Sequence, residues 1–124
     1  MKDKIEYFYS TGKRKTSIAR VFLKKGNGNI IINKIENNFN DKKKIYTIKK
    51  PLDALNIKNE IDIYATVKGG GNTGQAEAIK HGISRALVKL DEKLFEGKKE
   101  FKKKLRNIGY LTRDSRIVER KKVG

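Results

Sequence analysis

The residues with the most suggestive chemistry lie in a glycine-rich segment at positions 68–75, with the sequence KGGGNTGQ. Its glycines satisfy the G-x-G-x-x-G pattern of dinucleotide-binding loops, and Asp91 follows about 20 residues later, where a ribose ligand would stand. That pattern also requires the acid to end a second parallel strand. Asp91 instead ends a predicted helix, and residues 92–105 are lysine-rich and helical in period. We therefore reject a dinucleotide site and keep a simpler expectation, that backbone N–H groups at a helix start attract phosphate.

A second segment suited to phosphate is residues 11–16, with the sequence TGKRKT. Three consecutive cations flank Gly12, which would let a nucleic-acid backbone approach closely. The segment is not a P-loop, because Tyr7 stands where that motif needs an earlier glycine and Arg14 stands where it needs a hydroxyl. A solvated loop explains the same charges, and the charge pattern alone favours neither interpretation.

A third basic segment is residues 112–122, with the sequence TRDSRIVERKK. Its three arginines are spaced by three and four residues, with two acids between them. The planar guanidinium makes bidentate contacts with phosphate, so this spacing favours a segment that holds a nucleic-acid backbone while it is partly self-neutralised. A disordered basic tail is the alternative.

Catalysis and metal binding have little support in the composition. The chain has one histidine and no cysteine, so it cannot build a structural zinc site. His81 lies in a predicted helix, where a lone histidine is usually a surface or packing residue. We therefore expect no enzyme activity, no metal and no cofactor.

The charge balance predicts a polyanionic partner. Lys and Arg total 31 against 14 Asp and Glu, which gives a net charge of +17. Residues 1–34 and 94–124 each carry a net +7, whereas residues 35–93 carry only +3. The apolar runs are too short to span a bilayer, and the charged N-terminus is not a secretory signal, so no membrane partner is expected.

The hydrophobic pattern predicts a mixture of strands and helices. Strands are expected at 7–9, at 17–24 and at 61–67. Tyr7, Phe8 and Tyr9 could stack on bases, but strand core is the favoured interpretation. The Asn27-Gly28 pair predicts a hairpin over residues 21–32. Helices are expected at 35–40, at 52–57 with Pro51 in the first helical position, at 75–92, and after Gly97 with a cap near Gly109.

The three basic or glycine-rich segments, in this order, resemble the ninth protein of the small ribosomal subunit, in its bacterial or organellar form. Residues 9–21 (YSTGKRKTSIARV) are similar to the opening strand of that family. Residues 69–76 (GGGNTGQA) with 80–87 (KHGISRAL) are similar to its signature loop and helix, and residues 112–124 to its arm. The resemblance runs from Tyr7 to Gly124.

The resemblance implies an α+β fold, a mixed four-stranded sheet backed by helices with an unusual left-handed β-α-β crossover, as in the second domain of the fifth small-subunit protein. It implies a globular rRNA-binding domain at 1–109 and the start of an extended basic arm at 110–124. The implied function is that of a structural constituent of the subunit head in a cytoplasmic or organellar ribosome. The implied partners are 16S-type small-subunit rRNA, through its 3′ major domain, and neighbouring head proteins.

Carried over by motif position, the expected rRNA contacts are Lys13, Arg14, Lys15, Arg20, Lys68, Gly70, Gly71, Arg85, Arg113, Arg116, Arg120, Lys121 and Lys122.

Two departures from the family pattern stand out. The lysine-rich stretch at 95–104 is longer than the family's usual segment. The family's arm also continues into a basic tail that reaches the peptidyl-site tRNA, whereas this chain stops at Gly124, so contact with that tRNA is expected only through a tail beyond Gly124. A DNA-binding architectural protein and a nucleotide-dependent enzyme that uses the glycine-rich loop remain the alternatives.

Overall fold

A sheet covered on one face by helices forms the body of the protein in a computed structural model. The structure describes residues 7–14, 16–33, 35–36, 42–57, 59–69 and 71–111. The strands are β1 (Phe8–Arg14), β2 (Ser17–Lys25), β3 (Ile30–Ile32), β4 (Ile35–Glu36) and β5 (Ile61–Lys68). The helices are α1 (Lys42–Ala54), α2 (Asn72–Phe95) and α3 (Phe101–Ile108).

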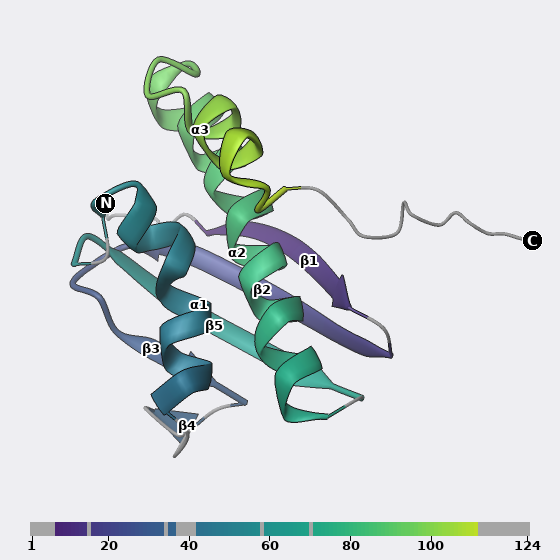
Figure 1. Cartoon of the computed structure of the whole chain (residues 1–124). Coiled ribbons are helices and arrows are strands. Elements are labelled where there is room, and N and C mark those ends of the chain that lie inside the picture. Colours follow the sequence, from purple (N-terminus) through teal and green to yellow (C-terminus); the bar gives the residue numbers. More distant parts are fainter. Residues whose placement is uncertain are drawn as a thin grey trace, which may run out of the picture.

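The sheet has the order β1-β2-β5-β3-β4 and mixes both pairing senses. β3 pairs in parallel with β5, while the other neighbours are antiparallel. The expected mixed four-stranded sheet is confirmed in β1, β2, β5 and β3, and the two-residue β4 adds a short edge. Seen from the helix side with β3 and β5 pointing up, β5 lies to the left of β3, so the crossover through α1 is left-handed (Figure 1).

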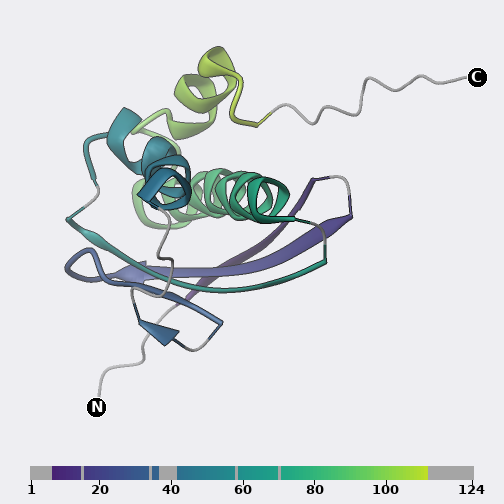
Figure 2. The same cartoon turned by 60° about the horizontal axis from the view of Figure 1, so that its bottom comes forward.

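The helices all lie on one side of the sheet, and the other side is not covered by any described element (Figure 2). Side chains alternate accordingly, as the burial of odd-numbered residues along β5 shows. The core joins Val21, Leu23 and Ile63 of the sheet to Ile79, Ile83 and Leu87 of α2, all nearly inaccessible to solvent. The predicted strand at 61–67 and helix at 75–92 are therefore confirmed.

The last helix and its cap are also confirmed. α3 buries Phe101 and Leu105. Gly109 ends it with a φ of 94°, and the N–H groups of Gly109 and Tyr110 both donate to the Leu105 carbonyl. The helix therefore ends at Gly109, and Tyr110 and Leu111 after it are partly buried against the core.

The predicted hairpin over 21–32 is wrong. β2 and β3 do not pair, because β5 lies between them and pairs with both. The Asn27-Gly28 turn exists, with a φ of 97° at Gly28, but it lies against the start of β5 instead of joining two paired strands. The Asp62 carboxylate on β5 accepts the N–H groups of Asn27, Gly28 and Asn29 at 2.8–3.0 Å. A contact from a strand distant in sequence thus replaces the local hairpin.

Two helix predictions also fail. Ile35–Glu36 forms a strand, and the rest of the predicted helix at 35–40 lies outside the described residues. Pro51 does not start a helix but stands inside α1, near its end. The chain tolerates it because the Pro51 ring is fully buried beside Leu52 and Ile48, so packing offsets the lost backbone hydrogen bond.

Candidate nucleic-acid interface

Two of the predicted phosphate-binding segments meet at one end of the sheet. The turn after β1 packs against the glycine-rich loop after β5, where the Ser17 hydroxyl donates to the Gly69 carbonyl at 2.9 Å. Gly69 has a φ of 84°, and a side chain there would collide with the Thr16 carbonyl. The absence of a side chain at Gly69 therefore lets these two backbones pack together.

The cations of these segments project from the uncovered sheet face at that end. Lys13, Ile18 and Lys68 stand opposite one another on β1, β2 and β5, and all three are exposed. Arg20 lies exposed one row further along β2. Residues 55 positions apart in the sequence thus form one basic cluster, defined here as Lys13, Arg20 and Lys68.

The start of α2 adjoins this basic cluster. Gly71 is its N-cap, in an extended conformation, and a glycine has no side chain with which to cap the helix. The Gly71 carbonyl accepts the Gln75 N–H at 2.9 Å, as the first turn requires. The N–H groups at a helix start attract anions, so the helix adds a partial positive charge to the basic cluster.

The remaining expected contacts divide into three groups. Arg14 is half-buried on β1, where it has an interaction partner, and Arg85 is exposed on α2. The residues outside the described part of the chain are Lys15, Gly70, Arg113, Arg116, Arg120, Lys121 and Lys122.

Arg85 has a structural contact that the sequence did not reveal. Its Nη1 donates to the Thr11 carbonyl at 2.9 Å, and one turn later Lys89 Nζ donates to the Tyr9 carbonyl at 2.7 Å. β1 is the edge strand among the described residues, so these carbonyls face no other described strand. The two cations cover that edge. Their four-residue spacing, which places both on one face of a helix, was the only sequence feature that pointed to a shared role.

Gly12 faces the helix layer rather than a phosphate. It is buried, and a side chain there would overlap the Ala78 carbonyl and lie 2.5 Å from the Gly82 nitrogen. The expectation that Gly12 admits a nucleic-acid backbone is wrong, because the backbone of α2 occupies the space.

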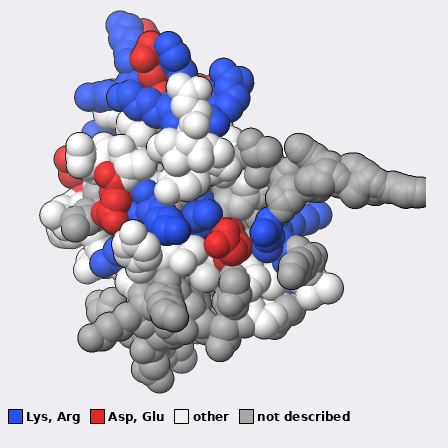
Figure 3. All heavy atoms as spheres, viewed as in Figure 1, with Lys and Arg blue, Asp and Glu red and all other residues white. Residues whose placement is uncertain are grey.

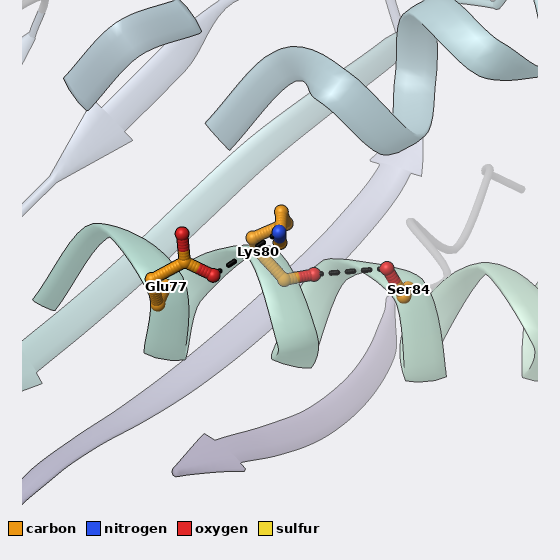
Figure 4. A network of polar contacts seen from close by, with 3 residues as sticks. All are labelled: Glu77, Lys80 and Ser84. Carbon is orange, nitrogen blue, oxygen red and sulfur yellow. Dashed lines mark hydrogen bonds and ion pairs between the residues drawn. The ribbon is translucent and has the colours of Figure 1, made fainter. Parts of the chain in front are cut away.

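His81 is a packing residue rather than a surface one. It is only 9% exposed. The polar side of the helix instead carries an ion pair between Lys80 Nζ and Glu77 Oε1 at 3.1 Å, while the Ser84 hydroxyl donates to the Lys80 carbonyl at 3.0 Å (Figure 4). Lys80 also lies 4.9 Å from the centre of the Tyr110 ring, which links α2 to the chain after α3.

Two acids that could suggest chemistry have structural partners. Partial burial raises the pKa of Asp62, but the N–H groups of Asn29, Asn27 and Gly28 and the nearby Lys24 outweigh it, so the pKa lies below its ordinary value. Asp91, once a candidate ribose ligand, is buried and accepts the N–H groups of Lys99 and Phe101 at 3.1 Å. It therefore caps α3 from within α2.

The lysine-rich stretch at 95–104 forms the end of α2, a turn and the start of α3. Lys and Arg side chains gather at this end of the helix-covered face, with acidic side chains among them (Figure 3). Lys102, Lys103 and Lys104 are exposed, and Lys98 pairs with Glu96 at 3.6 Å. This group is a second basic surface, separate from the basic cluster at the far end of α2.

The sequence missed an aromatic row on the uncovered sheet face. Phe8 is buried, as expected, but Tyr7 and Tyr9 are 50% and 40% exposed, so their assignment to the core is wrong. Tyr9 stands opposite Phe22, and Phe22 opposite Tyr64, on β1, β2 and β5. The aromatic residues occupy alternate positions in the predicted strands, which was the available sign of an exposed face. Only the register between the strands shows that they form one row.

Other site types find no support among the described residues. Within that part of the chain, no three His, Asp or Glu side chains are grouped so as to hold a metal ion. In the same residues, no helix is both long and apolar enough to cross a membrane.

Comparison with known families decides the identity. The sequence profile described as ribosomal protein S9/S16 matches residues 12–124, which is nearly the whole chain. The chain belongs to the ribosomal protein S9/S16 family. It is thus a ribosomal protein of the small subunit, an RNA-binding protein with a structural role in translation, and the family is of a structural, non-enzymatic kind. The resemblance stated from the three motifs is confirmed.

Proposed function

We propose that this protein binds the 3′ major domain of 16S-type rRNA in the head of the small subunit, acting as a scaffold rather than as an enzyme. The observation that carries the proposal is the meeting of two segments, distant in sequence, in one basic cluster beside a helix start whose N-cap is a glycine. Membership of the S9/S16 family supports rRNA as the polyanion.

The mechanism is electrostatic positioning on a rigid frame. Lys13 on β1 and Lys68 on β5 both stand opposite Ile18 on β2, so the backbone hydrogen bonds of the sheet set the distance between them. Cations held in this way contact phosphates with little loss of conformational entropy beyond that of their own side chains. RNA shape, phosphates and 2′-hydroxyls would then supply most of the recognition.

The proposal assigns residues 1–109 to a globular domain and residues 110–124 to an arm that holds rRNA through Arg113, Arg116, Arg120, Lys121 and Lys122. These cations would neutralise rRNA phosphates. Neighbouring head proteins complete the environment, in a cytoplasmic or an organellar ribosome.

The first test is sedimentation of the tagged protein from lysate through a high-salt sucrose gradient. Stoichiometric migration with the small subunit supports the scaffold role. Migration as free protein, or with DNA, rejects it and favours an architectural DNA-binding protein.

A sharper test measures the salt dependence of binding to a transcript of the 3′ major domain. The double variant Lys13→Ala/Lys68→Ala should bind more weakly and lower the slope of log K against log salt by roughly one for each phosphate that is no longer neutralised. The double variant Lys102→Ala/Lys103→Ala removes the same charge from α3 and serves as the control. Equal effects from both variants would show that net charge, not the basic cluster, determines binding.

A further inference from the structure

The uncovered face of the sheet has a composition that a solvated surface does not explain. Aromatic rings stand in register across its strands, and the Tyr9 and Phe22 ring centres are 4.8 Å apart, those of Phe22 and Tyr64 6.0 Å apart. Tyr7 extends the group, with its ring edge-on to Phe22 at 6.2 Å. Large rings left half-exposed and adjacent mark an interaction surface.

The charges around these rings indicate a negatively charged partner. Going along the strands from the aromatic row, the next row holds Arg20 between two threonines, and the row after it holds Lys13 and Lys68. On the other side, Lys24 Nζ lies 5.9 Å from the centre of the Tyr7 ring. The fully described strands β1, β2 and β5 contain a single acid, Asp62, whose Oδ1 already accepts three N–H groups.

We propose that this face is a stacking platform for a single-stranded segment of RNA, with bases on Tyr9, Phe22 and Tyr64 and phosphates along Arg20, Lys13 and Lys68. The inference rests on the proposed rRNA-binding function and adds to it a site at which unpaired bases stack. Aromatic rings flanked by cations are what single-stranded nucleic acid requires, because every base has a face that stacks.

The geometry fits successive nucleotides. Neighbouring strands place side chains about 4.8 Å apart, and rows two residues apart along a strand are separated by about 6.7 Å. A base on the aromatic row therefore leaves its phosphate within reach of Arg20 in the next row. A double helix would present phosphates alone to this face and leave the rings without partners.

A protein partner fits the same face less well. The rows beside the rings carry a net positive charge, whereas the centres of protein interfaces are depleted in lysine. Such a partner would have to be acidic opposite the two basic rows, which hold Arg20, Lys13 and Lys68, while supplying apolar side chains to the aromatic row beside them. We therefore propose RNA as the partner of this face, and the test below distinguishes it from a protein partner.

The test replaces rings by aliphatic side chains. The double variant Tyr9→Leu/Tyr64→Leu keeps apolar contact with Phe22 but removes the faces that bases would stack on. Tyr46→Leu is the control, since Tyr46 is 63% exposed on α1, away from the sheet face. Circular dichroism and thermal unfolding check folding, and the single variant Tyr9→Leu, on the edge strand, is used if the double variant does not fold.

Affinity is measured for an unstructured adenosine-rich oligoribonucleotide and for the 3′ major domain transcript, over a range of salt. The aromatic variant should bind the oligoribonucleotide roughly tenfold or more weakly, with its salt slope unchanged, because stacking releases no counterions. The Tyr46→Leu control should bind as the wild type does.

The other outcomes separate the two proposals. Wild-type affinity of the aromatic variant for both RNAs overturns the stacking platform and leaves the rRNA scaffold intact. Normal binding to both RNAs combined with failure to enter the small subunit assigns the face to a protein and also overturns it. If the wild type binds the transcript no better than unrelated RNA, the proposed function itself fails.

Discussion

Replacing Gly12 by alanine separates two interpretations of the first basic segment. A glycine that admits RNA phosphate would tolerate alanine in the free protein and lose affinity for RNA. The structure predicts the opposite order of effects. Gly12 is buried against α2, so alanine should destabilise the fold and should alter RNA binding only through unfolding.

The size of the effect follows from the contact. A Cβ on Gly12 would overlap the Ala78 carbonyl and lie 2.5 Å from the Gly82 nitrogen, while ordinary contact begins near 3.4 Å. Both obstacles are backbone atoms of α2, so no side chain can rotate away. The helix would have to move outward by about 1 Å or more, which would also stretch the bond between Arg85 and the Thr11 carbonyl. Overpacking of this kind costs about 3 kcal/mol.

Urea unfolding followed by circular dichroism measures this cost, and Gly71→Ala is the matched control. A Cβ on Gly71 would meet no heavy atom within 4 Å, and the φ of this residue is −95°, so alanine there should cost less than about 1 kcal/mol. The reasoning is refuted if Gly12→Ala unfolds at the wild-type urea concentration yet binds rRNA more weakly.

Three further outcomes are expected. Asp62→Asn should destabilise the protein by about 1 kcal/mol at neutral pH, after allowance for solvent exposure. Because the folded-state pKa of Asp62 is depressed, the contribution of this carboxylate to stability is present above the unfolded pKa of about 3.9 and is lost as pH falls through the folded-state pKa. The difference in unfolding free energy between the variant and the wild type, measured by urea titration, should therefore shrink in acid. Asp91→Ala leaves the N–H groups of Lys99 and Phe101 without their acceptor, and hydrogen exchange should show faster exchange confined to α3; unchanged protection would contradict the capping role. The double variant Arg85→Met/Lys89→Met keeps helix propensity but uncovers the β1 edge, and light scattering should detect more aggregation than in Lys102→Met/Lys103→Met.

The sequence by itself determined the partner class and the long regular elements. The excess of lysine and arginine required a polyanion, and charge needs no fold to be counted. The strand at 61–67 and the helix at 75–92 followed from periodicity, because each buries one face against the same core. Three separated motifs in order were enough to suggest the family.

Only the tertiary structure decided which residues meet. Local turn chemistry at Asn27-Gly28 predicted a hairpin, but β5 inserted between the two strands and its Asp62 took the turn's N–H groups. The same insertion set Phe22 and Tyr64 side by side and brought Lys68 into the row of Lys13. Cross-strand register depends on pairing between segments about 40 residues apart or more, and no local pattern contains that information.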